Sequence, residues 1–236
     1  MTEDYYKFLR EKEFFDSIIN EVSDNQSWCS YIARIACSAY IEEIEDLDNT
    51  YSLIFKLIDN ASVLYITSIV SYFFNLRKNS LSDKKVSKII KLWSKLCEKL
   101  QSYKDDKAYN NCIIDLLQLI SLMPYIDEVI MKNIEFSIRW IPQASIELYL
   151  LDSFLKLYAD ETSCKYVEKI LESFSANKVF FYDYSGKLTE LFKKIHNSNP
   201  TEAIKLCNIY VQGGYTNYLA LLNDFKLKKK FTLSNE

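Results

Sequence analysis

The chain of 236 residues contains only three glycines and three prolines, carries a formal net charge of −3, and is 49% hydrophobic. Glycine-rich phosphate loops and dinucleotide-binding turns need two or three glycines within a short span, and the only close pair here is Gly213–Gly214. The sequence therefore excludes the commonest nucleotide-binding folds. The small net charge gives no general attraction to nucleic acid or to a membrane.

The N-terminus and the cysteines favour a cytoplasmic protein. Glu3 and Asp4 lie where a signal peptide carries positive charge, so we do not expect secretion. The six cysteines are widely spaced and none forms a Cys-x-x-Cys pair. We expect them to be reduced, buried thiols.

Helical periodicity covers the first half of the chain. It predicts helices over 3–21, 27–46, 50–77 (as one long or two short helices), 83–100 and 106–123. In 83–100 the apolar residues form one stripe, and Ser82 or Asp83 can cap the helix. The stretch 60–76 carries no charge but is shorter than the ~20 residues that span a bilayer, and it contains several polar residues. We therefore predict a buried central helix there, not a membrane segment.

The second half has a regular helical rhythm, with helices predicted over 125–139, 143–159, 162–175, 186–197, 200–211 and 215–227. Pro124 and Pro142 fit the first turn of a new helix, and Pro200 opens another. Gly213–Gly214 closes that helix. The aromatic run 179–186 is predicted to be a loop or an extended edge segment.

About eleven helices joined by short loops are expected to pack as antiparallel neighbours. Two helices in roughly every 35–40 residues is the rhythm of helical-hairpin repeats. In this respect the chain, especially from Pro124 to Phe225, resembles HEAT- and armadillo-type α-solenoids. The segments 140–143 (Trp-Ile-Pro-Gln) and 199–204 (Asn-Pro-Thr-Glu-Ala-Ile) are similar to helical-repeat tails of some bacterial anti-phage defence proteins. The resemblance implies an all-α HEAT-like solenoid or irregular helical bundle.

We expect a single all-helical domain over 1–236, with a soft division near 101–106 between an N-terminal bundle and a C-terminal array of helical hairpins.

The sequence offers little material for catalysis or metal binding. Its only histidine, His196, lies at the end of a predicted helix, where an imidazole interacts favourably with the helix dipole. The acidic run that starts at Asp46 fails as an EF-hand, because its sixth position is Tyr51 and its twelfth is Leu57. We therefore predict no catalytic, metal-binding or cofactor-binding residues, and no enzymatic activity.

Charge is distributed unevenly along the chain. Residues 1–60 contain five bases and thirteen acids, whereas residues 77–104 contain nine bases and two acids. On the helix 83–100, lysines at spacings of three or four form one continuous ridge. This ridge and the acidic run before Asn49 supply the candidate partner-binding residues, which are Lys84, Lys88, Lys91, Lys95, Lys99, Glu42, Glu43, Glu45 and Asp46.

Two functions remain open on the basis of the sequence. The first is a non-enzymatic helical-repeat adaptor or scaffold in the cytoplasm, which binds a protein partner or a second copy of itself through a helical surface. The second is a nucleic-acid-contacting subunit of a larger assembly, including one in anti-phage defence, that uses the lysine ridge 84–99. The ridge lacks arginine, which weakens phosphate recognition and favours the first function.

Overall fold

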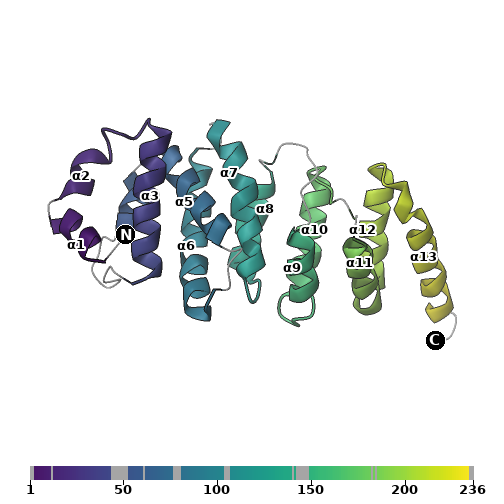
Figure 1. Cartoon of the computed structure of the whole chain (residues 1–236). Coiled ribbons are helices and arrows are strands. Elements are labelled where there is room, and N and C mark those ends of the chain that lie inside the picture. The colour runs from purple at the N-terminus through teal and green to yellow at the C-terminus, as the bar shows by residue number, and fades with distance from the viewer. Residues whose placement is uncertain are drawn as a thin grey trace. The chain divides into compact units, whose positions relative to one another are not determined.

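In the computed structural model of the chain, the described residues are 3–11, 13–43, 53–60, 62–76, 81–103, 107–139, 141, 149–181, 183 and 185–233. Within these ranges the fold is all-α, without a β-strand, as predicted (Figure 1). The chain divides into two compact units, Met1–Leu122 and Met123–Glu236. None of the described helices combines the length and the apolar character that crossing a bilayer requires.

The first unit contains seven α-helices and a 3-10 helix among its described residues. They are α1 (Glu3–Glu11), α2 (Phe14–Ile18), α3 (Gln26–Ile41), α4 (Leu53–Asn60), α5 (Val63–Leu76), α6 (Asp83–Gln101), α7 (Lys107–Gln118) and η1 (Leu119–Leu122). Helix α5 packs against α3 on one side and α7 on the other, while α6 contacts α4, α5 and α7. The three helices α3, α5 and α7 therefore lie side by side, and α4 and α6 pack behind them.

Sequence patterns explain most of these helices. Ser82 caps α6 by accepting a hydrogen bond from the Lys85 amide, and Asn25 caps α3 through the amides of Ser27 and Trp28. The apolar stripe of α6 is buried, and the indole of Trp93 donates to the carbonyl oxygen of Leu116 at 2.9 Å. The uncharged stretch supplies α5, and seven of its fourteen residues are buried.

The prediction of one helix over 3–21 is wrong. The chain breaks at Glu13, whose φ of 53° lies in the left-handed region, so that α1 and α2 are separate helices. Tyr6 and Phe15 then pack against each other, with ring centroids 5.9 Å apart. On one continuous helix these residues would be about 13 Å apart along the axis. The contact between the rings thus requires the break.

In the second unit, as in the first, every second helix packs against the next one in the series. Its helices are α8 (Glu128–Ile138), α9 (Tyr149–Leu157), α10 (Cys164–Ala176), α11 (Lys187–Ser198), α12 (Pro200–Gln212), η2 (Thr216–Tyr218) and α13 (Leu219–Leu233). Helix α10 packs between α8 and α12, and α11 contacts α9. The core between them is rich in aromatic rings, which include Phe154, Phe174, Phe181 and Tyr210.

The predicted positions of proline at helix starts and of glycine at a helix end are confirmed in part. Pro200 is the first residue of α12, and Gly213 follows its last turn. Pro124, however, is not in the first turn of a helix, because α8 begins only at Glu128 and Asp127 caps it through the amide of Ile130. Pro142 lies outside the described residues. The run 179–186 forms no helix in its described part, in agreement with the prediction of a loop.

Candidate functional site

The lysine ridge of α6 lies largely against acidic and carbonyl groups of the same chain. Lys84 pairs with Glu43 at 2.6 Å and Lys85 pairs with Glu42 at 2.5 Å. Lys88 is buried and reaches Glu43 at 3.0 Å. Lysines of α6 therefore contact Glu42 and Glu43, about forty residues earlier in the chain, within the first unit.

The ammonium group of Lys88 also caps the C-terminal end of α3. It donates to the carbonyl oxygens of Tyr40 and Ile41 at 2.9 and 3.1 Å. The last carbonyls of a helix lack partners within the helix and favour a nearby positive charge. Hydrogen bonds from Lys84 and Lys88 hold the pKa of the Glu43 carboxyl below its usual value. This part of the ridge thus has a structural role.

The remaining ridge lysines differ among themselves. Lys95 pairs with Asp59 at 2.9 Å, and Lys99 donates to the backbone oxygen of Asp59 at 2.6 Å. Lys91 is exposed, and the described part of the chain places no carboxylate within ion-pair distance of it. Of the other candidate residues, Glu45 and Asp46 lie outside the described residues.

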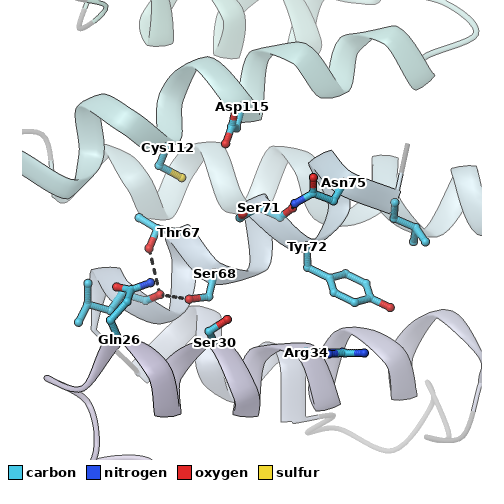
Figure 2. Close-up of a pocket in the computed structure, with 12 residues that line it drawn as sticks. Gln26, Ser30, Arg34, Thr67, Ser68, Ser71, Tyr72, Asn75, Cys112 and Asp115 are labelled. Atoms are coloured by element: carbon cyan, nitrogen blue, oxygen red, sulfur yellow. Dashed lines mark hydrogen bonds between the residues drawn. The ribbon is translucent and has the colours of Figure 1, made fainter. Parts of the chain in front are cut away.

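A groove that sequence reasoning missed lies between α3, α5 and α7 (Figure 2). Its volume is about 710 Å³. The lining is mostly uncharged and polar. It consists of Gln26, Ser30, Arg34, Leu64, Thr67, Ser68, Ser71, Tyr72, Asn75, Leu76, Cys112 and Asp115.

Helix α5 supplies the floor of this groove through residues at helical spacing. Thr67, Ser71 and Asn75 follow one another at intervals of four, so they lie on one face. The sequence contained this signal in the polar residues of the uncharged stretch 60–76. They counted there only as evidence against a membrane segment, since nothing in the sequence indicates that two other helices leave this face open.

Among the described residues that line the groove, Arg34 is the only basic one. Its side chain is exposed, and no carboxylate of the described residues lies within ion-pair distance of it. Burial raises the pKa of Tyr72, which lies across the groove on α5, and the positive charge of Arg34 acts in the opposite direction. Among the described residues the guanidinium therefore has no ion-pair partner, and its charge acts on the hydroxyl of Tyr72.

Helix α3 also carries two large exposed aromatic side chains in the two turns before Arg34. Trp28 is 45% exposed and Tyr31 is 47% exposed. Their rings form an edge-to-face pair with centroids 6.1 Å apart. Exposed aromatic rings beside an arginine are the composition that dominates binding energy in protein interfaces.

His196, near the end of α11, stacks on Phe225 with ring centroids 4.2 Å apart, and its Nε2 atom is buried without a hydrogen-bond partner. No group of three or more His, Cys, Asp or Glu side chains is arranged to hold a metal ion in the part of the chain that the structure describes. The six cysteines are free thiols, and all except Cys164 are buried.

The chain matches no model of a known protein family, and neither curated proteins nor solved structures gave a significant match. Its function is therefore inferred from its own residues and their geometry.

Proposed function

We propose that this protein is a non-enzymatic adaptor of the cytoplasm that binds a protein partner through a helical surface. The observation that carries the proposal is the exposed pair of Trp28 and Tyr31 on α3, the helix that also carries Arg34. Half-exposed aromatic rings leave apolar area in water, and an interface would bury that area at little cost in side-chain entropy.

The arrangement of helices is also consistent with a scaffold. In each unit, alternate helices pack side by side, as in α3, α5 and α7 or in α8, α10 and α12. We propose that this is a HEAT-like helical-repeat arrangement. Such arrays present long, continuous surfaces to partners. Five buried free thiols support a reducing compartment.

The proposed surface differs from the lysine ridge. Lys84, Lys88, Lys95 and Lys99 contact acidic or carbonyl groups of the chain itself. The same contacts reduce the positive charge available to phosphates, so we rank the adaptor above a subunit that contacts nucleic acid. We keep nucleic acid as an outcome of the test.

The proposal is tested by affinity capture from a lysate of the source organism. The wild-type protein and the double variant Trp28→Ala, Tyr31→Ala are used as baits in parallel. We expect the wild type to retain a specific protein, and the double variant to bind that purified protein at least tenfold more weakly, since each interface aromatic contributes about 2 kcal/mol.

The matched control is Lys91→Glu, which changes an exposed ridge residue and should leave capture unchanged. Retention by the double variant equal to that by the wild type would refute the proposal. So would a wild-type protein whose binding is to nucleic acid, falls steeply with salt, and is lost in Lys91→Glu.

A further inference from the structure

The groove between α3, α5 and α7 has the dimensions of a site for an extended peptide. Along α5 it runs from Leu64 to Leu76, which is about 18 Å at the rise of an α-helix. A chain in extended conformation covers that length with about five residues. The volume of about 710 Å³ is in the range of ligand-binding clefts.

The polar side chains of the floor donate hydrogen bonds within α5, which leaves their oxygen atoms free to accept hydrogen bonds from a ligand. The hydroxyls of Thr67 and Ser68 both donate to the carbonyl oxygen of Leu64, at 3.0 and 2.7 Å (Figure 2). The amide nitrogen of Asn75 donates to the carbonyl oxygen of Ser71 at 2.9 Å. Each of these groups donates to the helix, and each side-chain oxygen keeps lone pairs for an incoming donor. A ligand rich in N–H groups fits this floor.

The wall formed by α3 offers hydrogen-bond donors and therefore needs an acceptor on the ligand. Arg34 offers guanidinium donors with no counter-charge among the described residues. A guanidinium binds a carboxylate through two parallel hydrogen bonds. With one arginine and the carboxylate of Asp115 in the same lining, a singly charged carboxylate suits the groove better than a doubly charged phosphate, which is usually held by several basic residues.

We infer that this groove binds an extended peptide segment of the partner, with backbone amides toward Thr67, Ser68 and Asn75 and a carboxylate on Arg34. The inference rests on the proposed adaptor function and names the part of the partner that the surface recognises. Trp28 and Tyr31 then contact the partner beside the segment, outside the groove. The carboxylate is that of an acidic side chain within the segment, and a free C-terminus is an outcome that the test distinguishes.

The inference is tested with a phage-displayed library of random peptides. The library is selected on the full-length protein and depleted on the variant Ser71→Trp. Ser71 is exposed in the lining, so a tryptophan there fills the groove without entering the core. Ser87→Trp is the matched control, because Ser87 is exposed on α6 and does not line the groove.

We expect the selected peptides to share one acidic position. Synthetic copies, with free and with amidated C-termini, distinguish the two sources of the carboxylate when their binding is measured by fluorescence polarisation. Arg34→Glu should weaken binding at least tenfold, and Arg34→Lys should weaken it less. A peptide with lysine in place of the acid should regain binding to Arg34→Glu.

Three results would overturn the inference. They are a library with no enriched sequence, peptides that bind Ser71→Trp as tightly as the wild type, and peptides that are indifferent to Arg34→Glu. Circular dichroism and urea unfolding of each variant separate loss of binding from loss of fold. If the captured partner depends on Trp28 and Tyr31 but not on Arg34 or Ser71, the adaptor function stands and the peptide groove does not.

Discussion

Lys88 and Tyr40 form two hydrogen bonds with each other, and each residue is the donor in one of them. The Lys88 ammonium donates to the Tyr40 carbonyl oxygen at 2.9 Å, and the Tyr40 hydroxyl donates to the Lys88 carbonyl oxygen at 3.3 Å. The ammonium also lies 5.7 Å from the centre of the Tyr40 ring. Burial raises the pKa of the Tyr40 hydroxyl to about 12, so it stays a donor at neutral pH. This pair joins the end of α3 to α6.

Replacement of Lys88 by methionine should destabilise the protein by about 2 kcal/mol, because the terminal carbonyls of α3 lose a charged donor in a buried site. The measurement is the free energy of unfolding in urea. Lys91→Met is the matched control on the same helix, and an exposed substitution of this kind should change stability by less than about 0.5 kcal/mol. Equal unfolding midpoints for the two variants would contradict the structural role of Lys88.

A close approach at Gly213 gives a second prediction. A Cβ atom at this position would lie 2.6 Å from Cζ of Phe180, whose ring packs against Tyr210 and Tyr215. The φ of −74° at Gly213 suits any residue, so Gly213→Ala tests crowding alone. We expect a loss of about 1–2 kcal/mol from overpacking.

The double variant Gly213→Ala, Phe180→Leu should recover part of that loss, because the smaller side chain removes the clash. A double-mutant cycle from urea unfolding measures the interaction between the two positions. Strictly additive effects would mean that the ring of Phe180 is not what Gly213 accommodates.

Glu202 gives a prediction about pH. Burial raises the pKa of its carboxyl, the nearby carboxylates of Glu172 and Glu168 raise it further, and Lys205 lowers it. Because the pKa in the folded state exceeds that in the unfolded state, this group stabilises the fold most at low pH. That contribution is lost as the pH rises through the folded-state pKa.

Glu202→Gln removes this loss and should raise the urea midpoint at about pH 7, with the advantage shrinking as the pH falls toward about 4. The control is Glu190→Gln, since Glu190 is exposed and pairs with Lys194 on α11. A lower midpoint for Glu202→Gln at neutral pH would show that its ion pair with Lys205 outweighs the effect of burial.

The cysteines should differ sharply in reactivity. Cys164 is the only one of the six that is not buried. Burial raises the pKa of Cys37 well above its usual value and that of Cys207 to about 11. Because the thiolate is the reactive form, a thiol reagent should label the native protein at Cys164 first. Cys164→Ser should abolish the fast phase, and rapid native labelling that survives this substitution would contradict the assignment.

Local sequence determined the helical class of this protein and most helix ends. Three helices begin at residues that favour a helix start, which are Ser82, Asp127 and Pro200. A cap or a first-turn proline depends only on residues within one helical turn, so the sequence alone indicates it. The apolar stripe of α6 identified its buried face for the same reason. No local pattern shows the break between α1 and α2, which lies at Glu13 and lets Tyr6 contact Phe15.

Only the tertiary structure decided what the charged and polar faces do. The lysines of α6 form a ridge in the sequence, but their surroundings depend on Glu42, Glu43 and Asp59, which packing brings beside them. The groove exists because α3, α5 and α7 leave one polar face of α5 open. Periodicity reports which side of a helix is polar. Whether that side meets a counter-charge, solvent or a cleft is fixed by contacts between residues far apart in the chain.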